Sequence, residues 1–402
     1  MLTPTKSILL QSLTLALCLY ACNNGTNSDA HRLEQSSAAT ISVEAGNYVE
    51  SWNLTTETTN KNFIEENIES IKLIPLETND NCLIGSISDI TLRGDTIIVA
   101  DINKSGKVYL FNSEGKYISS IGKKGEGPEE YGGLNELQIV GDTISITDWL
   151  RWQIVSYPLS GGKPKVISLN VFHPDKTFVL NDTTIIAASS YIPGRDFALA
   201  WLNADGTVRD SARPFQYSRS FPAGKLQPAN DGRLLYYSID SDTVFEVTPS
   251  SLRPVYALGI QNDFYGFIDK TLNQDWPSFN KALYTGNDAP LSAFNIVETD
   301  NKWFIYYQKG PRNFIGVKDK NSDSSKSYLR ADINERRISI PFTLYKGRGN
   351  TLITYFDYVF KEQIADVDKE WLYAKFPYAK SIIDNYDFDN QNPLVCLLNL
   401  KE

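Results

Sequence analysis

From Ile71 to the end of the chain, hydrophobic residues occur in short runs that alternate with polar turns. The runs are rich in Val, Ile, Tyr and Phe, and the turns between them contain Gly, Asp and Asn at intervals of roughly 8–12 residues. Residue types that favour strands, in runs too short for helices, are typical of an all-β protein. The pattern therefore predicts an all-β fold for most of the chain.

One unit recurs along this pattern: a polar turn, a β-rich run, a second turn and a second β-rich run. It first occurs as Gly94–Ala100 with Lys107–Phe111, and again as Gly141–Thr147 with Gln153–Tyr157, which begins 47 residues later (141 − 94). Four further copies begin at Asn181, Asp231, Asn301 and Gly349. A repeat of this size is typical of a four-stranded β-propeller blade. Six copies predict a six-bladed β-propeller.

Two segments depart from the repeat, and a third is expected to close the ring. The fourth and fifth copies start 70 residues apart (301 − 231), which leaves an insertion over 261–290 that we expect to form a loop or a short helix over one face. Apolar residues at helical spacing predict a helical excursion over Lys361–Asn385. A propeller joins its last blade to its first, so the final apolar run 393–400 is expected to pair with Ser70–Glu77.

The first 21 residues have the pattern of a secretory signal segment. Lys6 provides a positive charge, and a mainly apolar stretch follows from Ile8 to Leu19. The stretch ends in Leu-Tyr-Ala-Cys, which resembles the lipobox of bacterial lipoproteins and implies lipidation of Cys22; an ordinary signal peptide is the alternative. Acyl chains contribute ~0.8 kcal/mol per buried methylene, so such a protein would be anchored to a membrane without crossing it.

These patterns divide the chain into a signal segment at 1–21, a lipidated tether at 22–45 and the propeller at 46–402. The predicted location is extracytoplasmic, in the cell envelope and on the outer membrane. The formal net charge of −9 and the lack of a Lys/Arg run exclude the nucleic-acid binders, whose affinity comes mainly from phosphate neutralisation. In an extracytoplasmic protein, Cys82 and Cys396 could form a disulfide near the ring closure, or remain two buried thiols.

The stretch from Ala100 to Tyr131 resembles a known family. It combines Ala100-Asp101 with a Tyr109–Phe111 strand, Ile121-Gly122 and the motif Gly125-x-Gly127-Pro128-x-Glu130-Tyr131. This combination resembles the six-bladed β-propeller lipoproteins of Bacteroidetes, which are similar to NHL-repeat propellers. The resemblance implies a fold and a cellular location. It implies no particular chemistry.

No catalytic or metal-binding constellation is recognisable in the sequence. Its two histidines are His31, in the predicted tether, and His173, in a His-Pro turn without a surrounding motif. Metal sites and catalytic triads or dyads built on histidine need one that is held near its partners. Asp101 and Asp148 occupy equivalent positions in two repeats, which favours a structural role as acceptors for the amides of the next turn. No catalytic residue, metal site or cofactor is therefore predicted.

The best candidate for a binding surface lies on two loops that we expect to share one face of the ring. The first is the glycine-rich loop 122–133, and the second is the Asp-Trp-Leu-Arg-Trp segment 148–152. Indole rings beside an Arg could stack on and hydrogen-bond a sugar or a peptide. The alternative is that the aromatic residues only pack between blades. The predicted ligand-binding residues are Lys123, Lys124, Glu126, Tyr131, Trp149, Arg151 and Trp152.

The sequence leaves three function classes open. The first is a membrane-anchored, non-enzymatic recognition module for a glycan or a peptide, and the second is an interaction scaffold for another envelope protein. The third is a lyase or hydrolase that uses carboxylates. A groove lined by aromatic residues would favour the first, a broad apolar patch the second and a converging acid pair in a deep funnel the third.

Overall fold

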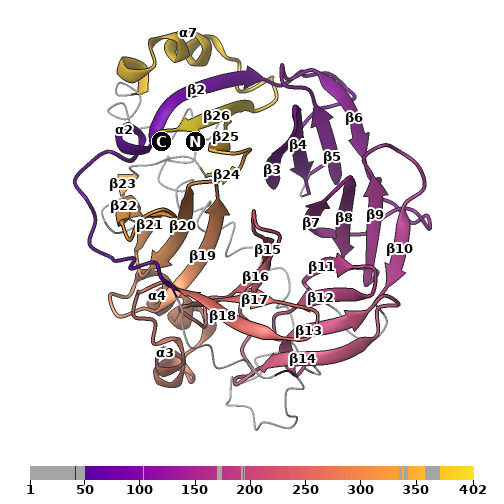
Figure 1. The fold of residues 1–402 in the computed structure, drawn as a ribbon, viewed down its shortest axis with the longest axis vertical. Helices are drawn as coiled ribbons and strands as arrows, with labels where there is room; N and C mark the ends of the chain where they lie inside the picture. The colour runs from indigo at the N-terminus through magenta and orange to yellow at the C-terminus, as the bar shows by residue number, and fades with distance from the viewer. Residues whose placement is uncertain are drawn as a thin grey trace.

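The computed structural model describes residues 41, 50–102, 104–169, 174–191, 193, 195–332, 334, 337–338, 343–357 and 372–402. Six β-sheets are arranged as blades around a central axis (Figure 1). The predicted six-bladed β-propeller is confirmed.

Each blade is an antiparallel sheet of four main strands, ordered from the centre of the ring outward (Figure 1). Blade 1 contains β3 (Asp89–Arg93), β4 (Thr96–Asp101), β5 (Lys107–Phe111) and β6 (Tyr117–Ile121). Blade 2 contains β7 (Leu134–Val140), β8 (Thr143–Asp148), β9 (Gln153–Pro158) and β10 (Lys165–Ser168). Blade 3 contains β11 (Lys176–Asn181), β12 (Thr184–Ala188), β13 (Phe197–Asn203) and β14 (Val208–Pro214).

The remaining three blades have the same order. Blade 4 contains β15 (Lys225–Pro228), β16 (Leu234–Tyr237), β17 (Thr243–Val247) and β18 (Leu252–Ala257), with the short β1 (Glu50–Ser51) at its outer edge. Blade 5 contains β19 (Leu291–Glu298), β20 (Lys302–Lys309), β21 (Arg312–Asp319) and β22 (Ser325–Asp332), followed by β23 (Arg337–Ile338). Blade 6 contains β24 (Tyr345–Lys346), β25 (Thr351–Phe356), β26 (Leu394–Leu400) and β2 (Ile68–Pro75).

The repeat seen in the sequence corresponds to the second and third strands of the blades. These strands are buried by the neighbouring blades on both faces; all five residues of β12, for example, are buried. Outer strands such as β10 are mostly exposed. The middle strands therefore keep a recognisable apolar pattern, whereas the outer strands vary.

The antiparallel order gives the ring two distinct faces. We call the crossover face the one that carries the loops from each fourth strand to the first strand of the next blade, together with the loops between second and third strands. The opposite face carries the remaining hairpin loops, and we call it the hairpin face. Loops 122–133 and 149–152 both lie on the crossover face, as predicted.

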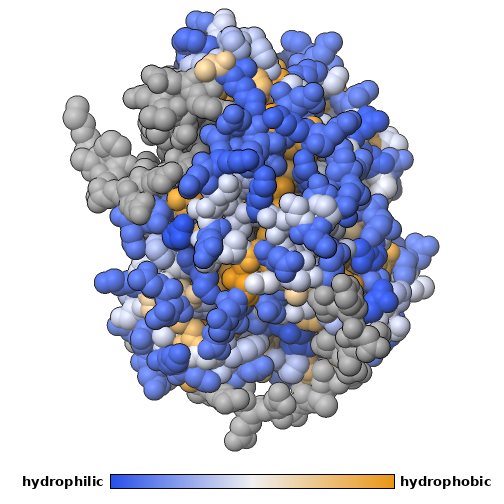
Figure 2. Space-filling model, turned by 60° about the vertical axis from the view of Figure 1, so that its left-hand side comes forward, coloured by the Kyte–Doolittle hydropathy of each residue, from blue (hydrophilic) through white to orange (hydrophobic). Residues whose placement is uncertain are grey.

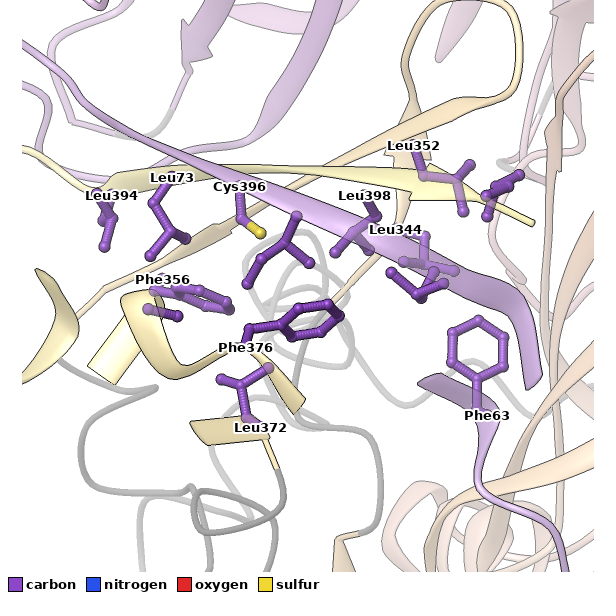
Figure 3. Close-up of a cluster of buried hydrophobic side chains, with 14 of the residues drawn as sticks. Phe63, Leu73, Leu344, Leu352, Phe356, Leu372, Phe376, Leu394, Cys396 and Leu398 are labelled. Carbon is purple, nitrogen blue, oxygen red and sulfur yellow. The ribbon is translucent and has the colours of Figure 1, made fainter. Parts of the chain in front are cut away.

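The ring is closed by strands from both ends of the chain. β2 pairs antiparallel with β26, from Ile68 opposite Leu400 to Pro75 opposite Leu394, which confirms the predicted closure. Figure 3 shows how Leu73 of β2 and Cys396 and Leu398 of β26 project into one apolar cluster. Phe63 of α2 (Phe63–Asn67) also packs in this cluster. The blade therefore depends on contacts between residues that are more than three hundred positions apart.

Residue 41 and the segment from residue 50 to β2 contact the outer edges of three other blades, a feature that the sequence did not reveal. Ile41 N–H donates to the carbonyl of Ser211 in blade 3 (2.9 Å), and β1 pairs parallel with β18. Trp52 is fully buried, with its ring 4.9 Å from Tyr256 of blade 4 and 5.4 Å from Trp303 of blade 5. This segment covers strand edges that would otherwise be open for pairing with another chain.

Glu66 of α2 ties this segment to blade 5 and gives the fold a specific acid sensitivity. Its carboxylate accepts hydrogen bonds from Tyr328 Oη (2.6 Å) and Lys326 Nζ (2.8 Å), and Lys61 Nζ lies 3.3 Å away. Burial acts to raise the pKa of Glu66, but these hydrogen bonds outweigh burial and lower the pKa from 4.5 to about 2.

Because this pKa is lowered on folding, Glu66 stabilises the fold above about pH 4.5, and the stabilisation is lost as the pH falls towards 2. We expect a loss of about 2 kcal/mol near pH 3 from this group alone. Urea unfolding of the wild type and Glu66→Gln at about pH 5 and pH 3 measures it. The variant should lose less stability between the two pH values, and equal losses would contradict the assignment.

The two departures from the repeat contain helices on the crossover face. The insertion 261–290 forms α3 (Phe264–Thr271) and α4 (Trp276–Thr285), whose buried residues join the core between blades 4 and 5. In the predicted excursion Lys361–Asn385, the structure shows a helical turn at 372–375 and α7 (Pro377–Asn385). Both helical predictions are confirmed for the described residues; 358–371 lie outside them. No helix within the described ranges is long and apolar enough to span a membrane.

Cys82 and Cys396 are both buried free thiols, so the disulfide is not formed. They lie in different apolar clusters: Cys82 packs beside blade 1, and Cys396 packs in the cluster of blade 6. The Cys82 thiol donates to the carbonyl of Glu77 (3.1 Å), and burial raises its pKa. Proximity to the ring closure was therefore not sufficient to pair them. The signal segment 1–21, Cys22 with the rest of the tether 22–45 apart from residue 41, and both histidines lie outside the described residues.

Candidate functional site

Arg151 holds the two candidate loops together. Its guanidinium donates hydrogen bonds to three carbonyl oxygens of loop 122–133, those of Gly127 (3.0 Å), Glu130 (3.0 Å) and Gly125 (2.5 Å). These bonds occupy the planar donor fork with backbone acceptors. Arg151 was predicted to contact a ligand, but in the structure its side chain binds the backbone of loop 122–133 and holds that loop in place.

Asp148 also holds the two candidate loops, 122–133 and 149–152, together. This fully buried carboxylate accepts from the backbone N–H groups of Gly132 (2.8 Å) and Gly133 (3.0 Å) in the preceding crossover. It also accepts from the N–H groups of Leu150 (3.2 Å) and Arg151 (3.3 Å) in its own turn. Four backbone donors on one carboxylate make this loop pair a single rigid unit.

Asp101 has the equivalent role in blade 1. Its carboxylate accepts from Lys104 N–H (3.0 Å) in the following turn and Gly85 N–H (2.9 Å) in the preceding crossover. The predicted bond to the following turn is confirmed for both aspartates. Their second set of partners, the amides of Gly85, Gly132 and Gly133, was not foreseen. Those glycines lie 15 or 16 positions before the aspartates, and only the ring geometry brings them close.

The charged residues of loop 122–133 pair mainly within the loop. Lys123 Nζ lies 2.5 Å from the Glu130 carboxylate, which also accepts from Gly127 N–H (2.8 Å). These hydrogen bonds, Lys123 first, lower the pKa of Glu130. The side chains of Lys124 and Glu126 are exposed on the same loop. Of the charged side chains predicted to bind a ligand, these two remain at the surface without a strong partner in the described structure.

Tyr131 belongs to the core and does not line a surface. It is fully buried between blades 1 and 2, and its hydroxyl has no hydrogen-bond partner among the described residues. Gly122 has φ of +80°, and a Cβ there would lie 2.7 Å from the Tyr131 ring. Burial raises the pKa of Tyr131 well above its usual value. The prediction that Tyr131 contacts a ligand is wrong in this structure, because the backbone of Gly122 covers the ring.

Trp149, Leu150 and Trp152 form an exposed apolar tip on the crossover face. Their relative exposures are 47%, 53% and 48%, high values for large apolar side chains. The backbone beneath them is held by the bonds Trp149 N–H to Gly133 O (3.1 Å) and Leu169 N–H to Trp152 O (2.6 Å). Trp152 has φ of +54°, a conformation that costs energy for a residue with a side chain. A strained turn presenting apolar side chains to solvent is a candidate recognition site.

A second polar cluster on the crossover face has no signal in the sequence. Asp240 accepts from Arg213 Nη2 (2.7 Å) and from Tyr265 Oη of α3 (2.7 Å). Burial acts to raise the pKa of Asp240, but Arg213 lowers it, so the carboxylate stays charged. Arg213 itself has φ of +59°. These hydrogen bonds attach α3 to blades 3 and 4 on the crossover face.

Arg219 stacks on an aromatic ring of the insertion 261–290. Its guanidinium is 4.2 Å from the ring centre of Phe279 and donates to the carbonyls of Leu272 (3.0 Å) and Gln274 (3.2 Å). These contacts fix the segment between α3 and α4. Within the described ranges, no three His, Cys, Asp or Glu side chains are grouped so that they could hold a metal ion.

Comparisons with known proteins identify a family for this chain and a solved structure with a similar fold. A family model described as "Domain of unknown function (DUF4934)" matches residues 49–397. A Bacteroides fragilis protein described as a presumed exported protein superposes with a TM-score of 0.69 at 18% identity, over 88% of this chain and 99% of that one. No functionally curated protein matches the sequence.

Two further solved structures are similar over most of the ring. A member of the DUF4221 family from Bacteroides vulgatus has a TM-score of 0.49 at 10% identity and covers 83% of this chain and 97% of that one. Virginiamycin B lyase from Staphylococcus aureus has a TM-score of 0.40 at 12% identity and covers 71% and 81%. The similarity to the Bacteroides fragilis protein, at 18% identity, shows the fold alone, so the role must be argued from the site.

Proposed function

Because this chain belongs to the DUF4934 family, whose function is unknown, we propose its role from its own surface: a non-enzymatic, extracytoplasmic recognition module. The protein would be held on the outer membrane by a lipid on Cys22 and bind a glycan or a peptide with its crossover face. The signal pattern of 1–21 and the presumed export of the similar B. fragilis protein support this location.

The observation that carries the proposal is the exposed tip of Trp149, Leu150 and Trp152 on a turn that Asp148 and Arg151 hold rigid. Rigid aromatic side chains lose little conformational entropy on binding and provide large contact areas. Because the Arg151 guanidinium is already bonded to loop carbonyls, recognition would depend on stacking and apolar contact. We therefore expect binding at this site to depend only weakly on salt.

A second candidate function is docking to another envelope protein. Leu150 favours it, because this aliphatic side chain is 53% exposed between the two indoles, and aliphatic groups pack well in protein interfaces. The same tip would then insert into an apolar pocket of the partner. The two candidates use the same residues, so ligand identity separates them.

We expect Trp149→Ala and Trp152→Ala each to weaken ligand binding by about tenfold to thirtyfold, equivalent to about 1.4–2 kcal/mol, because aromatic anchors dominate such contacts. A thermal-shift screen of the full chain against oligosaccharides and peptides would identify the ligand. A ligand at a hundred times its Kd stabilises the fold by about 2.7 kcal/mol, which displaces the melting curve visibly.

Ile118→Ala is the matched control, because Ile118 is 54% exposed but lies on the outer strand β6. Binding that survives both Trp substitutions, or that Ile118→Ala weakens equally, would exclude this tip as the site. If no member of the panel binds, the glycan or peptide assignment fails. Loss of an envelope protein from cross-linked complexes of the Trp variants would then support docking.

A further inference from the structure

A polar pocket lies on the hairpin face, where the N-terminal segment meets blade 5 and the end of the chain. Its volume is about 790 Å³, within the range of small-molecule sites. It is lined by residues of α2 and the preceding turn, by β20–β22 and the loop after β21, and by Lys401. We call it the closure pocket. Figure 2 shows the side of the ring that carries α2 and blade 5, where hydrophilic residues cover most of the surface.

Positive charge is in excess in the wall of the closure pocket. Four lysines line it, against three acidic residues. The lysines are Lys61, Lys302, Lys326 and Lys401, and the acidic residues are Glu65, Glu66 and Asp319. The Glu66 carboxylate is engaged by two of the lysines, Lys61 and Lys326. Over the whole wall the excess is one positive charge, and Lys302 and Lys401 are the two lysines of the lining that Glu66 does not engage.

Lys302 and Lys401 form no ion pair within the described ranges, and the ammonium group of each donates one hydrogen bond there. Lys302 Nζ donates to the carbonyl of Lys401 (2.8 Å), and Lys401 Nζ donates to the carbonyl of Glu65 (2.8 Å). An ammonium has three N–H donors, so two on each lysine remain for a ligand. These bonds also link β20, the end of the chain and α2, so the two charges are held at one side of the pocket.

Positive charges lie close together at this end of the closure pocket. Burial lowers the pKa of Lys302; Asp319 opposes this shift, while the charges of Lys326 and Lys401 add to it. Lys375, which donates to the carbonyl of Ile64 (3.2 Å), also has its pKa lowered by burial and by Lys401. Gathering like charges is unfavourable, and a bound anion would relieve it.

The size and lining of the pocket identify the class of anion. A single inorganic oxyanion would leave most of 790 Å³ unfilled. The wall contributes the amides of Asn60 and Asn62 and the hydroxyl of Ser324, with few apolar side chains. Amide and hydroxyl groups suit a ligand with many hydroxyl groups, and ammonium groups suit its carboxylate. We propose that the closure pocket binds a carboxylated saccharide, with Lys302 and Lys401 donating to its carboxylate.

This site is separate from the tip on the crossover face, because the two lie on opposite faces of the ring. The two proposals can therefore fail independently. Trp149→Ala should leave binding in the closure pocket unchanged, and Lys401→Met should leave binding at the tip unchanged.

The test is titration calorimetry of the full chain with glucuronate, glucose, inorganic phosphate and inorganic sulfate at low ionic strength. We expect glucuronate to bind, with an affinity that falls as salt is added. We also expect the affinity to fall as the pH rises through the lowered pKa of Lys302, because only the protonated ammonium attracts the carboxylate. Lys302→Met and Lys401→Met should each weaken glucuronate binding by about tenfold or more.

Lys163→Met is the matched control, because Lys163 is exposed on a hairpin loop of blade 2 and outside the pocket lining. Lys401 is exposed near the end of the chain, so its variant tests the proposal even if Lys302→Met does not fold. The proposal is overturned if glucuronate does not bind or if Lys401→Met binds it as the wild type does. If glucose binds as tightly as glucuronate, the carboxylate is not what the pocket recognises. If phosphate or sulfate binds as tightly as glucuronate, the saccharide is not what the pocket recognises.

Discussion

A chain that begins at Thr78, and therefore lacks β2, is expected not to fold cooperatively. β2 is the outer strand of blade 6 and pairs with β26 along its whole length. Its apolar side chains Ile68, Ile71, Leu73 and Ile74 are all buried. At about 1.5–3 kcal/mol per buried side chain, their loss is comparable to the total stability of roughly 5–15 kcal/mol of a typical domain. Removal would also leave β26 with an open edge and expose its apolar cluster (Figure 3).

Thermal unfolding and size-exclusion chromatography measure this effect. The matched control is a chain that begins at Ile41, which keeps the segment along blades 3 to 5 as well as β2. We expect the control to melt in one transition as a monomer and the shorter chain to aggregate or to lack a transition. A cooperative, monomeric chain starting at Thr78 would show that ring closure by β2 is dispensable.

The second large effect is expected for Asp148→Ala, with a loss of about 3–5 kcal/mol in the free energy of unfolding. The substitution removes the acceptor of four backbone N–H groups at the blade 1 to blade 2 junction. Each buried donor left without a partner costs about 1–3 kcal/mol, although donors near the surface recover part of this from water. Denaturant unfolding gives the difference directly.

Asp101→Ala is the matched control for this prediction, because Asp101 is equally buried but accepts from two backbone N–H groups among the described residues. We expect it to lose about half as much stability, roughly 2 kcal/mol. Asp148→Ala should also weaken ligand binding at the Trp tip, since the turn beneath Trp149 and Trp152 loses its support. If the two variants lose the same free energy of unfolding, the number of backbone N–H groups left without an acceptor does not determine the loss of stability.

Much of the fold could be predicted from the sequence because its signals are local. The middle strands of the blades are buried on both faces, so runs such as those of β4 and β12 keep their apolar pattern in every copy. Loops that connect the copies then had to follow the alternating direction of antiparallel strands. The sequence alone therefore predicts that 122–133 and 149–152 share one face of the ring.

The candidate site was predicted less well, because the role of a side chain depends on what lies around it. Tyr131 and Trp149 both occur as aromatic residues in polar loops, yet Tyr131 is fully buried and Trp149 is 47% exposed. Arg151 belongs to the predicted site, but its donors are occupied by carbonyls 21 to 26 positions earlier in the chain. Residue types alone do not distinguish a ligand contact from a loop support.

The sequence by itself determined the repeat, the number of blades, the pairing of the chain ends and the structural role of Asp101 and Asp148. The repeat, the number of blades and the role of the two aspartates follow from periodicity and short-range hydrogen bonding, whereas the pairing of the chain ends follows from the need of a propeller to close its ring. Only the tertiary structure decided that the cysteines stay apart, that Trp52 and Glu66 secure the outer edges, and that Lys302 meets Lys401 in a pocket. Those contacts join segments up to hundreds of residues apart, and ring closure, rather than any local pattern, brings them together.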